Sequence, residues 1–500
     1  MKRKSFFWLA LMVLSMLSTS VFAQFAGGSG TLQDPYRVST PVHLRQVAAY
    51  RNSCFVQIRD IDLDVAPWNS GSGWVPVRIN QNSTPIYDGN GHTISGLYVN
   101  RPGENGVGLF GNFKGVIKNL RLENVNVTGG EYTGGLIGLN QGTVKNCQCV
   151  TGTVSGSKFT GGLVGVNFGT ISACHNLSEI QGGDFTGGLV GWNYNFAALD
   201  DCFNSGKVCG NNIVGGLVGF NYDSSLQNCY NTGEVLGNEW LGGFVGYNIG
   251  EISRSYSTGT VSGQGKIAGF AGYNGYLASI QNCYATGDVS ADDYAGGFVA
   301  WNSHFATIQN CFSIGAVPDI SDAGGLLGYN YDDSGEIINS YWNVQTSGQT
   351  SSEGGEGRLT AQMVFPHDDD TYIGWDWDIW APDVSHSING GYPYLRALTD
   401  EVAIVEHIAP PQESSIRAFP QPANQKPKIS LKSDSAGELS WCIYNIRGQK
   451  VYSASICNPN REQSFELPGD AWMQLSNGVY LLSLESGNRK IASSRLVVLK

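Results

Sequence analysis

The chain has 500 residues, of which 67 are glycine, and a formal net charge of −12 from 30 Lys and Arg against 42 Asp and Glu. An acidic, cation-poor chain is not attracted to phosphate backbones or anionic lipids, so the composition argues against nucleic acid and membrane surfaces as partners. The glycine share is roughly twice the usual one, which predicts many tight bends.

Residues 1–23 have the pattern of a secretory signal peptide. Three cations at positions 2–4 precede an apolar run from Phe6 to Leu17. Small residues follow, and we expect cleavage between Ala23 and Gln24. The apolar run is too short to cross a membrane and no later segment is long and apolar enough, so no membrane span is expected.

Residues 24–103 are expected to form irregular capping coils that lead into a repeat region. Apolar and polar residues alternate over Val56–Leu63, and Asp88-Gly-Asn-Gly91 has the composition of a tight turn. The first coil of a stacked structure must shield the stack from solvent and from edge-to-edge association.

Residues 104–345 contain a recurring segment whose core reads Gly-Gly-Leu-Val-Gly-x-Asn, with successive cores 26 to 28 residues apart. Each unit holds three short apolar stretches separated by Gly, Asn, Ser or Asp, and none is long enough for a helix. Such a repeat predicts an all-β fold, a right-handed parallel β-helix of about nine coils of ~27 residues. The cores are Gly134–Asn140, Gly161–Asn167, Gly187–Asn193, Gly215–Asn221, Gly242–Asn248, Ala268–Asn274, Gly296–Asn302 and Gly324–Asn330.

A ladder of small side chains is expected inside the coils, because equivalent strands stack in register about 4.8 Å apart. We expect packing thiols, with disulfides between stacked neighbours as the alternative, since one coil spacing lies within the Cα range of a bridge. Metal binding is not expected, because no Cys-x-x-Cys pair or nearby His completes a ligand set. The ladder is Cys147, Cys174, Cys202, Cys229, Cys283 and Cys311, with Ser255 and Ser340 in the skipped places.

Asparagine marks two bends of each coil. It precedes several ladder cysteines, as at Asn146 and Asn282, where a left-handed turn would bring the thiol inside despite strict alternation. The last residues of the cores, from Asn140 to Asn330, form a second column. Their amides are expected to bond to each other and to the turn backbone.

An aromatic column occupies the variable place before this second Asn column. If it faces outward, stacked rings form a strip suited to sugar rings or partner surfaces, and the column is a candidate ligand-binding site. If it faces inward, it is core, and residue parity alone leaves both readings open. The column is Trp192, Phe220, Tyr247, Tyr273, Trp301 and Tyr329.

After the repeats, residues 346–408 are expected to cap the helix, with Trp375, Trp380 and Tyr392 among the bulky aromatics of a plug. The Pro-rich residues 409–425 predict a linker. Apolar and polar residues alternate over residues 426–500 as in a small antiparallel β-sandwich. Cys442 and Cys457 either form a disulfide there or stay reduced, and the sequence favours neither state. The expected strands are Lys428–Lys432, Glu438–Ile446, Gln449–Ser453, Ser464–Leu467, Gly478–Glu485 and Arg489–Leu499.

Motifs for chemistry are scarce, and we predict no catalytic residue, metal or cofactor. Neither His-Glu-x-x-His nor Gly-x-Ser-x-Gly occurs. Residues 159–345 contain only Lys207, Arg254 and Lys266 as cations, which argues against the basic cleft of a polysaccharide lyase. Acidic clusters are expected to be solvated turns rather than calcium or catalytic sites. They are Asp200-Asp201, Asp292-Asp293, Asp332-Asp333 and Asp368–Asp370.

The repeated Gly-Leu-Val/Ile-Gly core resembles the GLUG-motif family, and the resemblance extends over roughly residues 24–398. It implies a bacterial surface or adhesin-like protein, although such repeats also accompany protease domains in IgA-specific metallopeptidases. The last domain is similar to the sorting domain of the type IX secretion system, through Phe419-Pro-Gln-Pro-Ala423, Ile443–Val451, Ser476–Tyr480 and Arg495–Lys500. Gln421 stands where that family usually has Asn. The similarity implies export by that machinery in a Bacteroidetes-like bacterium, with removal of the domain and either release or surface attachment.

These observations together predict a secreted or surface-attached repeat protein that binds a glycan or an extracellular protein without catalysis. A carbohydrate-active enzyme, lyase or glycosidase, on the same scaffold is the alternative, and opposed carboxylates in a groove would favour it. A structural spacer without ligand is the third possibility.

Overall fold

The computed structural model describes residues 25–79, 84–331, 335–398, 415–419, 426–432, 439–445, 449–456, 463–486 and 489–498. The chain divides into two compact units, residues 1–408 and 409–500. The expected signal cleavage site at Ala23 and Gln24 lies outside the described residues, and so do Cys457 and the pair Asp332-Asp333.

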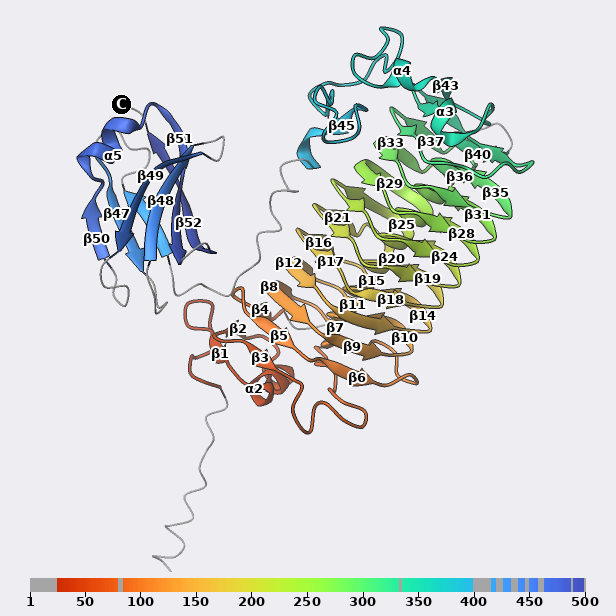
Figure 1. The fold of residues 1–500 in the computed structure, drawn as a ribbon. Coiled ribbons are helices and arrows are strands. Elements are labelled where there is room, and N and C mark those ends of the chain that lie inside the picture. Colours follow the sequence, from red (N-terminus) through yellow and green to blue (C-terminus); the bar gives the residue numbers. More distant parts are fainter. Residues whose placement is uncertain are drawn as a thin grey trace, which may run out of the picture. The chain divides into compact units, whose positions relative to one another are not determined.

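The first unit is a parallel β-helix built from stacked coils (Figure 1). One coil contains β14 (Lys158–Gly161), β15 (Val164–Asn167), β16 (Thr170–Ser172), β17 (His175–Asn176) and β18 (Glu179–Gln181). Each strand pairs in parallel with its equivalent one repeat later, so that Asn167 of one core lies beside Asn193 of the next. The predicted all-β parallel β-helix of about nine coils is confirmed in the described residues.

The widest sheet has two strand positions in each coil, separated by a bend. The first position holds β7 (Phe110–Phe113), β11 (Ile137–Asn140), β15, β20 (Val190–Tyr194), β25 (Val218–Gln227), β29 (Val245–Ser257), β32 (Ala271–Asn274), β36 (Val299–Asn302) and β40 (Leu327–Asn330). β25 and β29 continue around the bend into the second position. The other second-position strands are β8 (Val116–Glu123), β12 (Thr143–Cys149), β16, β17, β21 (Ala198–Asp200), β22 (Phe203–Asn204), β26 (Tyr230–Asn231), β33 (Ser279–Ala285), β37 (Thr307–Gln309), β38 (Phe312–Ser313), β41 (Glu336–Ile338), β42 (Tyr341–Asn343) and β43 (Glu356–Arg358).

Two eight-stranded sheets complete the cross-section. One sheet is formed by one of the three short apolar stretches expected in each unit. It holds β6 (Tyr98–Asn100), β9 (Val125–Thr128), β13 (Gly152–Ser155), β18, β23 (Val208–Cys209), β27 (Val235–Leu236), β30 (Val261–Ser262) and β34 (Val289–Ser290). The other sheet was not expected from the sequence. It holds β10 (Glu131–Gly134), β14, β19 (Asp184–Gly187), β24 (Asn212–Gly215), β28 (Glu239–Gly242), β31 (Gly265–Ala268), β35 (Asp293–Gly296) and β39 (Ala323–Gly324).

A left-handed residue explains why this last sheet escapes sequence analysis. The second residue of most of its strands has positive φ, for example 53° at Phe159 and 60° at Trp240. Such a residue breaks the two-residue alternation that identifies a strand. The coil therefore contains more strand than its three apolar stretches indicate.

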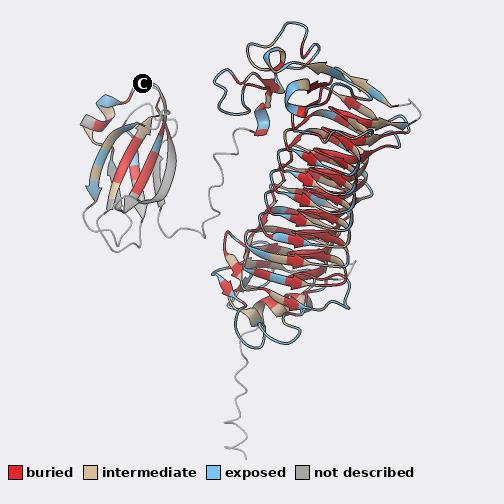
Figure 2. Ribbon diagram, turned by 45° about the vertical axis from the view of Figure 1, so that its right-hand side comes forward, coloured by how far each residue is buried: buried red, intermediate tan, exposed pale blue. Residues whose placement is uncertain are grey.

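One hydrophobic cluster fills the interior of the coils along the stack (Figure 2). In the coil of β15, Leu163, Val164, Ile171, Cys174 and Ile180 are each at most 1% exposed. Because equivalent residues of the next coil lie directly above, the core is continuous from end to end. A long buried core without helices is the expected result of stacking units that cannot bury their apolar side alone.

The turn before each ladder cysteine is left-handed, with φ of 53° at Asn146, 52° at Asn228 and 54° at Asn282. Ala173 and Asp201 adopt the same conformation where the repeat lacks Asn. The turn places the thiols in the core cluster, and all six ladder cysteines are free. Burial raises the pKa of the Cys202 thiol above its ordinary value and the pKa values of the Cys174 and Cys229 thiols well above it. These thiols are therefore neutral packing groups.

The second Asn column is a buried hydrogen-bonded ladder. Asn140 Nδ2 donates to Asn167 Oδ1 at 2.7 Å, and Asn248 Nδ2 donates to Asn274 Oδ1 at 2.9 Å. The same amide of Asn248 also bonds to the carbonyl of Gly250, and the Gly250 N–H donates back to Asn248 Oδ1. Each amide therefore ties one bend to the next coil and to its own turn. A parallel ladder, Asn176 to Asn204 to Asn231, lies at the bend after the cysteines.

The N-terminal end is covered by short elements. Thr40 caps α2 (Pro41–Gln46) by accepting a hydrogen bond from the His43 N–H. Phe25 is buried and stacks on Tyr36 with ring centroids 4.5 Å apart. The remaining elements of this end are η1 (Val47–Ala49), β1 (Tyr36–Val38), β2 (Cys54–Gln57), β3 (Ile61–Asp62), β4 (Ile86–Asp88) and β5 (Thr93–Ser95).

The C-terminal end is closed differently from the expected aromatic plug. Trp342 lies against the last core, where a Cβ on Gly325 would collide with its indole ring. The cap aromatics Trp375, Trp380 and Tyr392 instead cover the flank of the last coils, and Trp380 Nε1 donates to Asn282 Oδ1 at 3.1 Å. The cap elements are α3 (Val344–Ser347), α4 (Thr360–Met363), β44 (Trp380–Ala381), β45 (Tyr394–Leu395) and η3 (Arg396–Leu398).

The second unit holds a three-stranded and a four-stranded antiparallel sheet. The expected linker 409–425 contains the strand β46 (Ser415–Phe419), which lies between two proline-containing stretches. Its residues alternate and pair with β47 (Lys428–Lys432). The Cys442 thiol lies 3.4 Å from the Ser453 hydroxyl, which is its register partner. The elements are β46 (Ser415–Phe419), β47 (Lys428–Lys432), β48 (Leu439–Asn445), β49 (Lys450–Ile456), β50 (Gln463–Glu466), α5 (Gly469–Gln474), β51 (Gly478–Ser486) and β52 (Arg489–Val498).

Candidate functional site

The predicted aromatic column lies outside the core cluster. Val190 and Asn193 of β20 are fully buried, whereas Trp192 between them is half-buried. Because Asn193 turns its amide inward at the bend, the preceding side chain points to the opposite side of the strand. Phe220, Tyr247, Trp301 and Tyr329 are likewise half-buried, and Tyr273 is 4% exposed.

A second aromatic column, which sequence analysis missed, packs against the first. It comes from the left-handed positions of the unexpected sheet and reaches the following coil, as Phe159 does to Trp192 at 4.9 Å and Trp240 to Tyr273 at 5.5 Å between ring centroids. Glycine permits this approach, since a Cβ on Gly165 would lie 2.6 Å from the Tyr132 carbonyl carbon. The column is Tyr132, Phe159, Phe185, Trp240 and Tyr294, with Ile213 and Lys266 between.

Rings also stack along the rod and toward the neighbouring bend. Trp192 and Phe220 are nearly parallel at 6.0 Å, and Tyr247 and Tyr273 stack at 3.9 Å. Trp192 contacts Tyr194, the first of a further set of rings at the bend, at 4.6 Å. We call these contiguous rings the aromatic face. Aromatic pairs of this kind contribute about 0.5–1.5 kcal/mol each beyond their buried area.

The charges on the aromatic face are largely engaged by the face itself. Lys158 Nζ lies 4.8 Å from the centroid of Phe159, and Lys266 Nζ lies 5.1 Å from that of Trp240. Burial, with a smaller contribution from Tyr273, raises the pKa of Tyr247 well above its ordinary value. The face therefore offers rings and a neutral hydroxyl at physiological pH, a surface suited to sugar rings and protein side chains rather than to proton transfer.

A third aromatic column lies on another side of the coil and is structural. It follows the ladder cysteines, and its rings are almost parallel, with Phe203 and Tyr230 at 4.7 Å and Tyr256 and Tyr284 at 4.8 Å. The cap covers its C-terminal part. The recurrent aromatic residue directly after Cys is the sequence signal that could have revealed it.

A groove lies beside the aromatic face, at the bends that follow the Asn ladder. Its volume is about 430 Å³. Asp223 and Glu251, both exposed, are its charged residues. The remaining lining residues are Phe196, Ala197, Ser224, Ser225, Ile249, Gly250, Tyr276 and Leu277.

Two of the acidic residues named from the sequence contact side chains of the fold, and so does Asp60. Asp200 accepts a hydrogen bond from Asn228, and Asp370 lies 3.4 Å from Arg358. Asp60 contacts the ring of His92 at 3.2 Å. Within the described part of the chain, no group of three or more His, Cys, Asp or Glu side chains is arranged to hold a metal ion.

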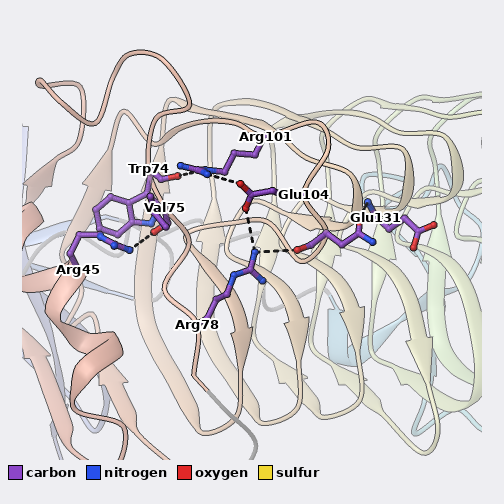
Figure 3. A network of polar contacts seen from close by, with 8 residues as sticks. Arg45, Trp74, Val75, Arg78, Arg101, Glu104 and Glu131 are labelled. Atoms are coloured by element: carbon purple, nitrogen blue, oxygen red, sulfur yellow. Dashed lines mark hydrogen bonds and ion pairs between the residues drawn. The ribbon is translucent and has the colours of Figure 1, made fainter.

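Arginines near the N-terminal end form a structural network (Figure 3). Arg45 donates to the Val75 carbonyl at 2.8 Å, and Arg101 donates to the Trp74 carbonyl at 3.1 Å. Glu104 contacts Arg101 and Arg78. Because the guanidinium groups bond to neighbouring carbonyls and a carboxylate, they fix the loop around Trp74 and are not free to bind an anion.

The comparisons with known proteins agree with the repeats and with the second unit. Residues 417–499 match the family described as the secretion system C-terminal sorting domain, and residues 210–236, 237–262 and 263–290 match the GLUG motif. No helix in the described ranges is long and apolar enough to cross a membrane.

The curated relatives are similar to only part of this chain. A segment of 119 residues is 36% identical to halomucin of Haloquadratum walsbyi and covers 21% of this chain and 1% of that protein. A segment of 109 residues is 38% identical to a "Putative Gly-rich membrane protein" of Evansella cellulosilytica, covering 21% of this chain and 13% of that protein. The chain thus spans a small part of the length of these curated relatives.

Two solved structures are also similar. A "putative immunoglobulin A1 protease" from Bacteroides ovatus has 17% identity and a TM-score of 0.40, and covers 75% of this chain and 96% of its own. An "IgA1 Protease" has 16% identity and a TM-score of 0.34, and covers 64% and 23% respectively. The family matches carry the conclusion: the chain contains GLUG motifs within residues 210–290 and a type IX C-terminal sorting domain at residues 417–499, and it is exported to the cell surface or secreted.

Proposed function

We propose that this exported protein is a non-enzymatic, adhesin-like rod that binds a glycan or an extracellular protein through its aromatic face. The observation that carries the proposal is the placement of the predicted column outside the core cluster, joined to a second column of rings. A protein that needed these rings only for stability could bury them inside the coil. Half-buried rings on a rigid scaffold retain surface for a ligand.

Repetition supports binding by many weak contacts. Equivalent rings recur once per coil, about 4.8 Å apart, so a ligand with its own repeat can engage several coils at once. Linked weak contacts raise overall affinity without any single tight site. A polymer or a surface is therefore a better ligand for this face than a small molecule.

The enzyme alternative has one observation in its favour, the groove lined by Asp223 and Glu251. A glycosidase needs two carboxyl groups flanking the scissile bond, with one kept protonated by a protected environment. Both of these residues are exposed. Binding without catalysis therefore remains the proposal, and the experiment must measure degradation as well.

The test is binding of the purified chain to an array of polysaccharides and extracellular-matrix proteins, with each glycan examined for cleavage. We expect the chain to bind saturably. Trp192→Ala and Trp301→Ala should each weaken this binding roughly three- to tenfold, because each removes a stacked ring. Phe203→Ala is the matched control, because it removes a stacked, half-buried ring from the third column. Glycan cleavage, or equal loss of binding in the control, would contradict the proposal.

A further inference from the structure

The groove arises from unequal loop lengths at one corner of the coil, between the Asn ladder and the next strand. Four residues form this corner after Asn193 (194–197) and again after Asn274 (275–278). Three residues (222–224) form it after Asn221, and two (249–250) after Asn248. Two short corners lie between two long ones and leave a notch across the rod, which is the groove described above. The long corners are three coils apart, roughly 14 Å at the usual strand spacing.

Apolar side chains stand on both walls of the notch. Phe196 is 85% exposed and Leu277 is 77% exposed. Phe305 belongs to the next long corner, the one after Asn302, and is 66% exposed. Hydrogen bonds from the Phe196 N–H to the Asp223 carbonyl and from the Leu277 N–H to the His304 carbonyl hold the corners in place. Backbone hydrogen bonds between neighbouring coils, like those that hold the β-helix together, therefore fix both walls.

The wall residues adopt an unfavourable backbone conformation. Phe196 has φ of 62° and Leu277 has φ of 65°, in the left-handed region where glycine and asparagine are easier to accommodate. A large apolar side chain that is both exposed and left-handed gains little from its own fold. The conformational cost at these exposed residues therefore points to a role other than stabilising the fold.

The floor of the groove carries uncompensated negative charge. Across the described residues, neither the Asp223 nor the Glu251 carboxylate has an ion pair or a hydrogen bond. The cations of residues 159–345 are engaged elsewhere, since Lys207 pairs with Glu234, Lys266 with Glu239, and Arg254 donates to Asn228. Two free carboxylates between apolar walls are complementary to a cation on an apolar stem.

We propose that this groove binds an arginine or lysine side chain from an extended basic segment of a partner protein. The cationic head lies between Asp223 and Glu251, and its methylene stem packs against Phe196 and Leu277. A neutral sugar would leave both charges uncompensated. The proposal goes beyond the function proposed for the aromatic face and stands on different residues.

The test uses fluorescence anisotropy of the full chain with a labelled nonapeptide that alternates arginine and serine. Binding is expected to weaken at least tenfold in the double variant Asp223→Asn/Glu251→Gln, and several-fold in Phe196→Ser. Asp292→Asn/Asp293→Asn is the matched control, because it removes two exposed carboxylates at the start of β35, outside the groove lining, and is expected to stay within twofold. Added salt should weaken binding, since the carboxylates are exposed.

Specificity is tested with the same peptide carrying citrulline in place of arginine, which is expected not to bind. Equal binding of the citrulline peptide, equal loss in the control variant, or unchanged binding in the Asp223 and Glu251 double variant would each overturn the proposal. Trp301→Ala, outside the groove lining, is expected to keep peptide binding. The peptide result and the array result can therefore fail separately.

Discussion

A single buried amide supports three neighbours in the Asn ladder. Asn248 accepts a hydrogen bond from Asn221, donates to Asn274, and bonds to both backbone groups of Gly250. Replacing it with an apolar residue removes these bonds and leaves buried polar groups without partners. The ladder is thus a set of individually important residues rather than a redundant column.

We predict that Asn248→Leu lowers the free energy of unfolding of the chain by about 2–4 kcal/mol, because buried groups lose partners. Asn330→Leu, at the half-buried end of the same ladder, is the control and should cost clearly less. Urea unfolding followed by circular dichroism measures both. Equal costs would show that the ladder does not act through burial.

At the scale of the element, the cap depends on one carboxylate. Asp383 is 1% exposed and accepts backbone hydrogen bonds from Ser387, Ile388, Asn389 and Gly391. Burial on its own would raise the pKa of this carboxyl group, but the four N–H donors dominate and lower the pKa below its ordinary value. The loop 383–391 folds around the ionised form.

Cap stability should accordingly fall at acid pH. An unfolded Asp titrates near 3.9, so the stabilisation is complete above that pH and is lost as the pH falls through the lower folded pKa. Asp383→Asn should destabilise the cap by about 1–3 kcal/mol at pH 7 and remove this acid dependence. Tryptophan fluorescence of the cap, between pH 7 and pH 2, is the measurement. An unchanged acid transition in the variant would refute the assignment.

At the corner that contains Phe196, a glycine substitution is predicted to be favourable relative to alanine. The left-handed backbone costs an L-residue about 1–2 kcal/mol, which glycine avoids. Phe196→Gly should therefore be more stable than Phe196→Ala, by up to about 1 kcal/mol after the entropy cost of glycine is included. Thermal unfolding of the two variants side by side decides this. A more stable alanine variant would mean that the corner is relaxed.

How far the sequence predicts these elements depends on local conformation. The ladder of Cys147 and the turn at Asn146 follow from residue type and period, because Asn favours the left-handed turn. The strand at Phe159 does not follow, since an aromatic residue with positive φ gives neither an alternation nor a turn signal. The unequal spacings of the repeat already show which corners are long. That the long corners form the walls of a groove becomes visible only when the coils are stacked.

At the scale of the whole molecule, each coil contacts mainly its neighbours, so coils should be separable units. Deleting residues 216–242 joins Gly215 to Gly243 and keeps register, because Gly215 and Gly242 are equivalent positions. We expect a folded, slightly shorter rod with an unchanged circular dichroism spectrum per residue. Deleting half of that segment is the control and should unfold the stack locally. Loss of structure in the whole-coil deletion would contradict nearest-neighbour stability.

The Asn ladder also gives the rod a direction. In every bond from Asn140 to Asn330 the donor belongs to the earlier coil and the acceptor to the later one. Amide dipoles aligned head to tail polarise one another, so the bonds of the row strengthen each other. The two ends therefore differ chemically, because within this row Asn140 donates to another Asn and Asn330 accepts from one. Any process that adds or removes coils would therefore meet two chemically different ends.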